Sequence, residues 1–594
     1  MKLSDYVFDF VSSLGTDHVF VIIGGANSHL ADSLSKNKKL KYICTQHEQA
    51  AAMAAEGYAR ASGKMGAALV TSGPGGTNAM TGLCGAWCDS VPVFFISGQV
   101  PSRLTTNGKT IRQLGVQQIN TTDFVKAGTK FVTMLDDPMK IRFYLEKAAF
   151  MARNGRPGPV WLDVPTELQH NMDIEPDKLE KFKPPVDTQT KKGVNGLMMR
   201  KIISMIKLAK RPLLIAGHGI RISGSTKIFQ EVIERLGFPV ITTWNGIDLL
   251  PHNHPLYVGC AGVMGQRGSN FAIANSDLII SIGSRLDTRQ VGNSPHLYAA
   301  HAKKIVVDID EHELKKGLIK IDLPIKMDAG EFLSLLKKNI PKQLPDINQW
   351  RNHCANWRKK YPVVLPEYKK NSGKVNSYAF IETLCQELAD DDIAVTDMGT
   401  SLTCTMQTFF VKKNQRLFTN TGFASMGFGL PCTIGAWFGR LDKSLNRIIG
   451  IYGDGGFQMN IQELQTVKHY NIPVKMFILN NKSYLTIKNT QELFFDGHLV
   501  GSNPQTGYSA PDFVKIAKGY DIPSYRINSQ KNMDSIIKKV LNSKGPVLCE
   551  VMMLEDQPLI PLSLLNKARG YAGSPIEVMY PFLSEEEQKE NMLS

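Results

Sequence analysis

The stretch RIIGIYGDGGFQMNIQELQTVKHYNIPVKMFILNNKSY, residues 447–484, decides the predicted fold of this chain of 594 residues. One apolar run is predicted to be a strand that ends at Gly453-Asp454-Gly455, and a second to be a strand that ends at Asn480-Asn481. Between them, apolar residues recur at helical spacing and predict a single amphipathic helix. These residues are Phe457, Ile461, Leu464 and Val467.

The two strand ends are expected to carry a shared site. A right-handed crossover brings both ends to the same edge of a parallel sheet, where α/β proteins bind ligands. We therefore expect Asp454 and Asn481 to meet, although an ordinary Asp-Gly turn beside a polar loop stays an alternative. Their oxygens, with a carbonyl just beyond Asn481, suit Mg²⁺ that completes its octahedron with phosphate oxygens and water. The glycines that would let the backbone approach a diphosphate are Gly453, Gly455 and Gly456.

The rest of the chain repeats this α/β character. Short β-rich runs alternate with helical patterns, which predicts parallel sheets covered by helices. Polar stretches near 169–194 and 344–374 separate three such units, and the first and third could share an architecture. The predicted domains are therefore 1–168, 195–340 and 375–566, followed by a tail over 567–594.

Charge limits the classes of partner. Lysine and arginine total 69 against 54 aspartate and glutamate residues, so the formal net charge is +15. The positive residues are spread along the chain, so we expect no nucleic-acid partner, while anionic small molecules stay open as ligands.

The N-terminus and the cysteines indicate a location. The opening MKLSDYVFDF has no continuous apolar region of the kind found in signal peptides, and no apolar segment reaches the length of a membrane span. Nine cysteines without a CxxC pair fit reduced thiols better than a disulfide framework. We expect a cytoplasmic protein with no membrane partner.

The stretch TQHEQAAAMAAEGYAR, residues 45–60, places one carboxylate at the start of an alanine-rich helix. Thr45 and Glu48 have the spacing of a capping box, in which the glutamate reaches back to the Thr45 backbone N–H. The face of Glu48 continues through Ala51, Ala52 and Ala55, so a second interpretation is a carboxylate beside a closely packed buried surface. A buried carboxylate needs a partner.

These motifs, in order along nearly the whole chain, resemble those of thiamine-diphosphate-dependent enzymes, and within them the acetohydroxyacid synthase (acetolactate synthase) large-subunit family. The segments that carry the resemblance are HEQAAAMAAEGYAR, TSGPGGTNAMTG, ISGQVP, GRPGPVWLDVP, TGFASMGFGLP, GDGGFQMNIQEL and the NN that follows. The resemblance implies three consecutive doubly wound parallel-sheet domains: pyrimidine-binding, central and diphosphate-binding. It also implies a homodimer or homotetramer with the active site between subunits.

The resemblance also implies roles for individual residues. Glu48 would hydrogen-bond N1′ of the aminopyrimidine and share a proton with it, which promotes deprotonation of the thiazolium. Asp454, Asn481 and the Ser483 carbonyl would bind Mg²⁺. Met426 would support the bent cofactor, with core packing as the alternative. Gln117 would lie near the reacting carbon, with a solvent-facing glutamine as the alternative. Further cofactor-binding candidates are Gly24, Gly25, Gly73 and Asn78.

The central domain of this family binds FAD, which takes no redox part in the main reaction. The chain carries family-like segments GHGIR, TTWNG, GCAGVMG, GSRLDTR and DID, each of which is also a plausible structural turn. Related decarboxylases bind a different nucleotide here, or none. The candidate FAD residues are Gly217, Gly219, Arg221, Gly283, Arg285, Arg289, Asp308 and Asp328.

Two departures from the family pattern affect the substrate prediction. Ile23 precedes Gly24 where the family has a glycine-proline turn, and Thr490 stands where the family usually has a tryptophan in the substrate channel. A lost aromatic wall alters how a pocket selects its second substrate. We expect decarboxylation of a 2-oxo acid, with pyruvate as the first candidate in view of the resemblance, and transfer of the two-carbon unit to a carbonyl acceptor. The alternatives are transfer to a nucleotide-linked keto-deoxysugar and a non-catalytic relative.

Overall fold

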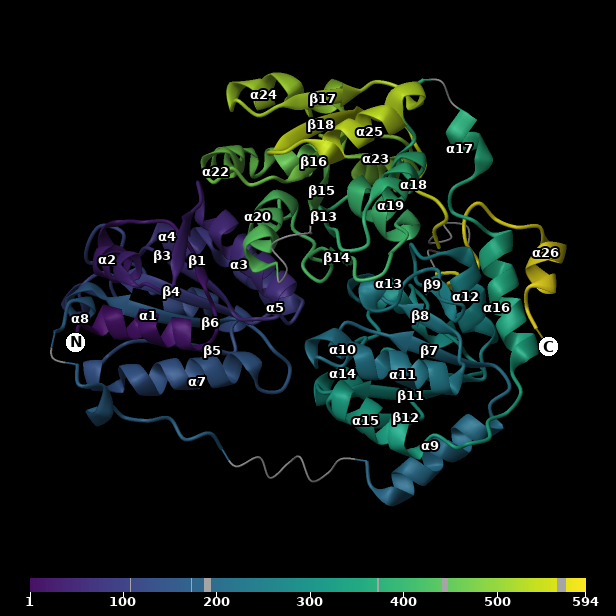
Figure 1. Cartoon of the computed structure of the whole chain (residues 1–594), viewed down its shortest axis with the longest axis horizontal. Helices are drawn as coiled ribbons and strands as arrows, with labels where there is room; N and C mark the ends of the chain where they lie inside the picture. Colours follow the sequence, from purple (N-terminus) through teal and green to yellow (C-terminus); the bar gives the residue numbers. More distant parts are fainter. Residues whose placement is uncertain are drawn as a thin grey trace.

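Three parallel sheets of six strands each form the protein in the computed structural model, at the corners of a triangle (Figure 1). The structure describes residues 1–106, 108–172, 174–185, 194–370, 373–440, 447–563 and 573–593. Each sheet is covered by helices, which confirms the predicted α/β fold class. The first sheet has the order β2 (Lys41–Cys44), β1 (His18–Val21), β3 (Gly66–Val70), β4 (Val93–Gln99), β6 (Val160–Pro165), β5 (Phe131–Met134).

The third sheet repeats the order of the first, as the sequence suggested. In chain order both sheets read second, first, third, fourth, sixth, fifth. The third consists of β14 (Arg416–Phe418), β13 (Ile393–Thr396), β15 (Ile448–Gly453), β16 (Lys475–Asn480), β18 (Val547–Met552) and β17 (Ser524–Ile527).

The central sheet has a different order, in which the first three strands and the last three run outward from the middle. This order is the one typical of dinucleotide-binding folds, and its reversal point lies between β7 and β10. The sheet consists of β12 (Leu323–Lys326), β11 (Lys303–Asp308), β10 (Leu278–Ile282), β7 (Pro212–Ala216), β8 (Val240–Thr242) and β9 (Tyr257–Cys260).

The helices connect these strands in chain order. The first unit has α1 (Leu3–Ser13), α2 (Ser28–Lys36), α3 (Glu48–Ser62), α4 (Pro74–Asn78), α5 (Met80–Cys88), α6 (Thr121–Val125), α7 (Ile141–Arg153) and α8 (Thr166–Gln169). The central unit has α9 (Gly196–Leu208), α10 (Gly219–Ile222), α11 (Thr226–Leu236), α12 (Arg267–Asn275), α13 (Thr288–Val291), α14 (Glu311–Lys315), α15 (Ala329–Asn339) and α16 (Asn348–Lys360). The remainder has α17 (Pro366–Lys370), α18 (Ser377–Glu387), α19 (Thr400–Thr408), α20 (Gly429–Gly439), α21 (Asp454–Gln458), α22 (Leu464–His469), α23 (Leu485–Phe494), α24 (Phe513–Gly519), α25 (Met533–Asn542) and α26 (Glu585–Glu590).

We predicted one continuous amphipathic helix after Asp454, and this prediction was wrong because the helix is interrupted. The segment forms α21, a 3₁₀ turn at Ile461–Glu463 and α22. Contacts to other parts of the chain interrupt it, because the Asn460 side chain donates to the Gly427 carbonyl (2.8 Å). The predicted apolar face still points inward, with Phe457, Leu464 and Val467 buried and Ile461 partly buried.

The polar stretch near 344–374 contains a helix that its composition concealed. In α16, Trp350, Cys354 and Trp357 share one face and are buried against the central core. Three apolar residues at helical spacing thus outweigh the many charged side chains on the other faces.

Helix α3 is rich in alanine because it packs between two other helices with almost no space. A Cβ atom on Gly57 would lie 2.2 Å from the Cys432 carbonyl oxygen of α20, and one on Gly435 only 1.8 Å from that of Ala54. Larger residues at this crossing would push the first and third units apart. Figure 1 shows α3, α5 and α20 side by side at this junction.

A buried ionic cluster closes the same junction. Arg60 donates to Glu56 Oε1 and to Asp89 Oδ2, both at 2.7 Å, and all three side chains are at most 2% exposed. Removing the cation would leave two carboxylates buried without their countercharge.

We expect Arg60→Met to lower the free energy of unfolding by about 3–5 kcal/mol, the usual cost of breaking a buried pair. Denaturant unfolding followed by fluorescence measures the change. Lys36→Met removes an exposed partner of Asp32 and is expected to change stability by less than about 1 kcal/mol. Equal effects of the two substitutions would contradict the assigned role of the buried cluster.

The described part of the tail, residues 573–593, packs on the central unit. Asn270 donates to the Ile576 carbonyl (2.7 Å), and Trp357 donates to Asn591 Oδ1 (2.7 Å). Figure 1 shows α26 beside α16.

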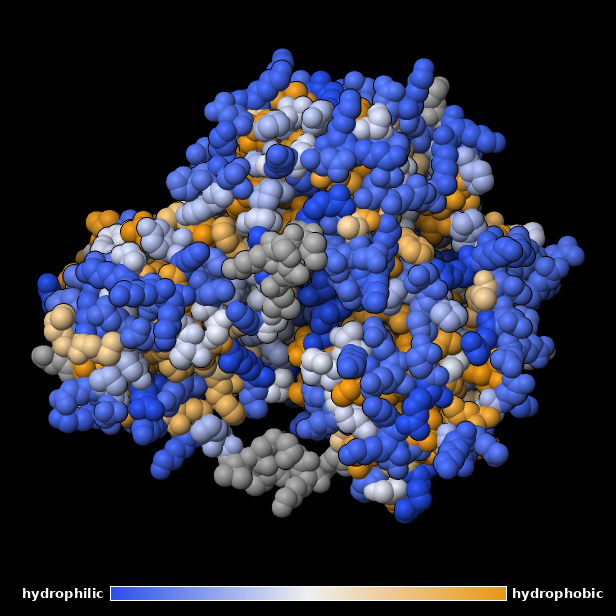
Figure 2. All heavy atoms as spheres, in the orientation of Figure 1, coloured by the Kyte–Doolittle hydropathy of each residue, from blue (hydrophilic) through white to orange (hydrophobic). Residues whose placement is uncertain are grey.

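None of the described helices combines the length and the apolarity needed to cross a bilayer. The face in Figure 2 is mainly hydrophilic with scattered apolar residues, an ordinary distribution for a globular protein.

Candidate functional site

The two strand ends of the third sheet meet as predicted. Strands β15 and β16 pair in register, so Asp454 and Asn481 follow neighbouring strand ends. Asp454 Oδ2 accepts from the Lys482 N–H and Oδ1 from the Gly455 N–H, both at 2.7 Å. The Ser483 N–H donates to Asn481 Oδ1 (3.1 Å). The candidate ligands therefore lie together, Asp454 at the start of α21 and Asn481 and Ser483 on the loop after β16.

The environment of Asp454 is nearly closed to water. Burial raises the pKa of its carboxyl to about 6, and hydrogen bonds from Tyr508 and from backbone N–H groups oppose this rise. A bound cation would compensate a carboxylate in this position, and one carboxylate with amide and carbonyl oxygens is a donor set that Mg²⁺ accepts. The described residues contain no group of three or more His, Cys, Asp or Glu side chains placed to hold a metal.

The glycines after Asp454 serve the protein itself as well as any ligand. A Cβ atom on Gly455 would lie 2.2 Å from the Tyr484 ring, and one on Gly456 would lie 2.7 Å from Asp397 Oδ2. Gly453 has only distant neighbours, the closest atoms being 3.8 Å from such a Cβ. Met426 is partly buried and packs against the core of the third unit.

Glu48 is the first residue of α3, and the capping-box interpretation was wrong. His47 is the N-cap, and its side chain accepts from the Gln49 N–H. The Thr45 N–H, which a capping box would pair with Glu48, donates instead to the Val21 carbonyl (3.2 Å), and the Thr45 hydroxyl donates to the His47 carbonyl (3.0 Å). Glu48 is 8% exposed.

The Glu48 carboxylate faces the loop after β3. Asn78 Nδ2 donates to Glu48 Oε2 (3.0 Å), and a Cβ atom on Gly75 would lie 3.6 Å from Oε1. Nearby, Thr71 Oγ1 and Ser72 Oγ are buried without a hydrogen-bond partner among the described residues. This cluster can hold a polar group beside a carboxylate that is screened from water.

The other first-unit candidates border the same loop. A Cβ atom on Gly24 would lie 2.7 Å from Thr71 Oγ1, and one on Gly73 would lie 2.5 Å from the Gln117 carbonyl, whereas Gly25 has open space around it. Gln117 itself is exposed and has a left-handed backbone with φ 64°. Within a single copy of the chain, the Gln117 side chain therefore faces solvent.

The central sheet carries a cavity, open to solvent, at its reversal point. Six of the eight central candidates line it, from the start of α10, the loop after β10, α13, the end of β11 and the N-cap of α15. They are Gly219, Gly283, Arg285, Arg289, Asp308 and Asp328.

The remaining two candidates are engaged elsewhere. A Cβ atom on Gly217 would lie 2.1 Å from the Gly283 carbonyl, so this glycine lets the loops after β7 and β10 touch. Arg221 forms an ion pair with Asp248 (2.9 Å), behind the cavity wall.

The chemistry of the cavity wall fits a dinucleotide. Arginines suit phosphates and carboxylates suit ribose hydroxyls. Four buried polar atoms of the wall have no hydrogen-bond partner among the described residues: His218 Nδ1, Asn245 Oδ1, Arg285 Nε and Gln290 Nε2. Burial beside Arg60 and Arg221 lowers the pKa of His218 to about 4, so this imidazole stays neutral near pH 7.

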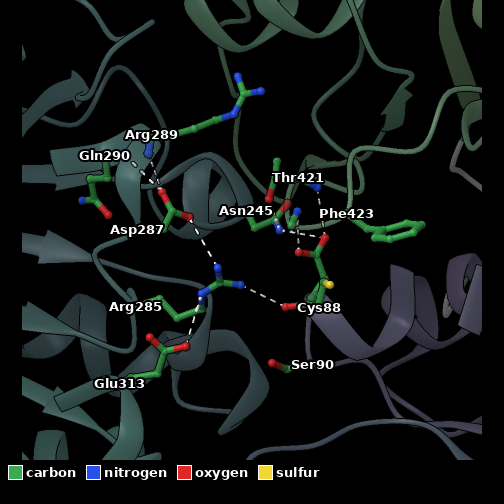
Figure 3. Close-up of polar contacts among 12 residues, drawn as sticks. Cys88, Ser90, Asn245, Arg285, Asp287, Arg289, Gln290, Glu313, Thr421 and Phe423 are labelled. Carbon is green, nitrogen blue, oxygen red and sulfur yellow. Dashed lines mark hydrogen bonds and ion pairs between the residues drawn. The ribbon is translucent and has the colours of Figure 1, made fainter. Parts of the chain in front are cut away.

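Sequence reasoning missed that all three units build this cavity. Cys88 and Asp89 come from the first unit, and Thr421 comes from the third. Arg285 has a left-handed backbone (φ 61°), contacts Glu313 (3.5 Å) and donates to the Cys88 carbonyl (3.0 Å) (Figure 3). No local sequence motif predicts these contacts, because they depend on how the three units pack.

Comparison with known proteins also finds three consecutive domains in this chain. Residues 1–124 match the family described as "Thiamine pyrophosphate enzyme, N-terminal TPP binding domain". Residues 199–336 match its central domain, and residues 397–551 match its C-terminal TPP binding domain. Thiamine pyrophosphate is another name for thiamine diphosphate.

Similarity to individual relatives extends over most of the chain. The acetolactate synthase large subunit of Lactococcus lactis is 32% identical over 560 residues, 94% of each protein. The probable acetolactate synthase large subunit of Methanocaldococcus jannaschii is 33% identical, again over 94% of each. Acetolactate synthase 2, chloroplastic, of Nicotiana tabacum is 31% identical over 94% of this chain and 83% of the relative. With three matching domains and relatives of this similarity, the chain belongs to the thiamine pyrophosphate enzyme family and is like the large subunit of acetolactate synthase.

Proposed function

We propose that this protein is an acetolactate synthase-like carboligase that decarboxylates a 2-oxo acid, with pyruvate as the first candidate, and transfers the two-carbon unit to a carbonyl acceptor. The observation that carries the proposal is the meeting of Asp454 with the Asn481 loop at neighbouring strand ends, in a chain that also presents Glu48 at a screened helix start. When bound, thiamine diphosphate supplies the carbon nucleophile and stores the electrons released with CO₂.

The chain would hold this cofactor at both ends. Asp454, Asn481 and the Ser483 carbonyl would hold Mg²⁺ against the diphosphate, and Met426 would support the middle of the cofactor. Glu48 would hold a proton at the aminopyrimidine. Its hydrogen bond from Asn78 fixes one oxygen, and the enclosed position keeps water from competing for the proton. Gln117 would approach the reacting carbon.

FAD is the dinucleotide we propose for the central cavity. The reversal point of the sheet, the arginine and carboxylate lining and the unpartnered polar atoms support it. The domain ranges 1–168, 195–340 and 375–566 would then be pyrimidine-binding, central and diphosphate-binding. Nine free cysteines support a reducing compartment such as the cytoplasm.

The active site would form between two copies of the chain, in a homodimer or homotetramer. Large apolar side chains are exposed beside both halves of the site: Ile23 (50%) and Val116 (87%) near the Glu48 cluster, and Ile487 (50%) and Phe495 (61%) beyond Asn481. Exposed apolar groups of this size mark surfaces that a partner covers.

The identity of the acceptor substrate is tested by identifying the product of the reaction. With pyruvate, Mg²⁺ and thiamine diphosphate, we expect CO₂ release and a product with the mass of acetolactate. Absence of cofactor-dependent CO₂ release from any 2-oxo acid would refute the proposal. If a product forms only with a nucleotide-linked keto-deoxysugar, that sugar is the acceptor in place of pyruvate. The proposed decarboxylation of the 2-oxo acid would still stand.

Thr490 tests how the acceptor is selected. It lies exposed on α23 and donates to the Thr486 carbonyl (2.9 Å), so its side chain forms no apolar wall. We expect Thr490→Trp to change the ratio of kcat/KM between two acceptors of different size by about 10- to 200-fold, the range of apolar pocket contacts. Thr486→Trp, one turn earlier on the same helix, is the control for added bulk. An unchanged ratio in Thr490→Trp would remove this residue from acceptor selection.

A further inference from the structure

Asp89 occupies the point at which the three units meet. It follows α5, and its side chain is 2% exposed. Besides Arg60, its carboxylate accepts from two backbone N–H groups of the third unit, those of Thr421 (3.1 Å) and Gly422 (2.9 Å). It therefore anchors the start of the loop that carries Met426.

Asn245 connects this anchor to the cavity. Its Nδ2 donates to Asp89 Oδ2 (3.2 Å) and to Thr421 Oγ1 (2.8 Å). An ionised carboxylate only accepts, so the amide nitrogen must face Asp89 and the amide oxygen must face away from it. That oxygen is the buried atom without a partner, on a residue that lines the cavity. Figure 3 shows Asn245 and Thr421 together beside Cys88.

The contacts continue from the loop to the diphosphate half of the site. Beyond Met426, the Gly427 N–H donates to Asp397 Oδ2 (3.2 Å), and its carbonyl accepts from Asn460 Nδ2 (2.8 Å). Asp397 also lies against Gly456, two residues after the Mg²⁺ candidate Asp454. Polar contacts thus hold both ends of the segment 421–427: Asp89 and Asn245 at its start beside the cavity wall, and Asp397 and Asn460 at Gly427 beside the loops that would hold thiamine diphosphate.

We propose that Asn245 and Asp89 are positioning residues that couple occupancy of the dinucleotide cavity to the conformation of the Met426 loop. A ligand hydroxyl or ring N–H that donates to Asn245 Oδ1 fixes the amide, whose other end fixes Asp89 and Thr421. Ordering the loop in advance lowers the cost of binding thiamine diphosphate. The inference rests on the proposed function, which assigns the two cofactors to these two places.

The test is a binding cycle on the full-length protein stripped of cofactors. The dissociation constant of thiamine diphosphate, with Mg²⁺ present, is measured by fluorescence with no FAD and with saturating FAD. We expect FAD to tighten thiamine diphosphate binding by about 5- to 150-fold, with the same factor when the order is reversed, as linkage requires. In Asp89→Asn and in Asn245→Ala, this ratio should fall to within about twofold of one.

Two features keep the test decisive. In Asp89→Asn, Arg60 retains Glu56 as a partner, so the charge of Arg60 stays compensated. Asn245→Ala is a second, independent variant that changes no charge. Asp277→Asn is the matched control, because Asp277 also accepts from two backbone N–H groups, those of Lys210 (2.7 Å) and Arg211 (2.9 Å), but lies in the central unit outside the residues that line the cavity. Its ratio should match that of the wild-type protein.

The outcomes separate this inference from the proposed function. No binding of thiamine diphosphate to the wild-type protein would refute the proposed function and this inference with it. Binding of thiamine diphosphate without binding of FAD would leave the carboligase proposal standing and overturn the coupling. The coupling is also overturned if both cofactors bind with a wild-type ratio of one, or if Asp89→Asn and Asn245→Ala keep the wild-type ratio.

Discussion

Glu48→Gln is expected to retain thiamine diphosphate and to lose turnover by about 10²- to 10⁴-fold, the usual contribution of a positioned acid-base group. Glutamine has the shape of glutamate and can still accept from Asn78, so the geometry of the helix start is preserved. What it loses is the ability to hold and return a proton. Turnover is measured as CO₂ release from pyruvate, and retention is measured as the dissociation constant of the cofactor.

The comparison needs a substitution of the same kind elsewhere. Glu331 also lies in the first turn of a helix, α15, but is exposed and belongs to the central unit. Glu331→Gln is expected to leave both quantities unchanged. Should Glu48→Gln turn over pyruvate within about threefold of the wild-type rate, Glu48 would not be the proton-holding group that we assign.

Asp454→Ala is expected to weaken Mg²⁺-dependent binding of thiamine diphosphate by about 100-fold or more. Loss of groups that only orient a metal ligand already costs about 10- to 100-fold, and Asp454 is assigned as a ligand itself. The substitution also removes the acceptor of the Gly455 and Lys482 N–H groups, so the loop loses its fixed shape. Titration of the cofactor at fixed Mg²⁺ measures the effect.

The control removes an exposed carboxylate elsewhere in the third unit. Asp534 lies on α25, is exposed and pairs with Lys538. Asp534→Ala should bind the cofactor as the wild-type protein does. Unchanged affinity in Asp454→Ala would show that the diphosphate is held elsewhere.

The two variants together test the shared active site. If Glu48 of one copy works with Asp454 of another, a dimer of one Glu48→Gln chain and one Asp454→Ala chain has one intact site of two. Such a heterodimer, purified with two different affinity tags, should recover about half of the wild-type turnover. If both residues belonged to a site within one chain, the heterodimer would be as inactive as its parents.

Local sequence was sufficient for the diphosphate half of the site. Two apolar runs with polar residues at their ends predicted strands β15 and β16, and the handedness of the crossover placed Asp454 near Asn481.

Local sequence failed where distant parts of the chain compete for the same backbone groups. Thr45 and Glu48 have capping-box spacing, but the Thr45 N–H donates to the Val21 carbonyl at the end of β1 (3.2 Å), and Glu48 accepts from Asn78 instead. Likewise, the helix after Asp454 is periodic enough to be continuous, and Asn460 interrupts it to reach Gly427.

The sequence by itself determined the three α/β units, the polar residues at each strand end and the family. Hydrophobic periodicity and the geometry of parallel crossovers depend on neighbours in the chain and need no knowledge of how the units pack. Only the tertiary structure decided that Asp89, Asn245 and Thr421 share one wall of the cavity, and that Arg221 turns away from it to Asp248. These outcomes depend on which buried polar groups find partners after packing, and a buried group without a partner costs too much free energy for local preference to prevail.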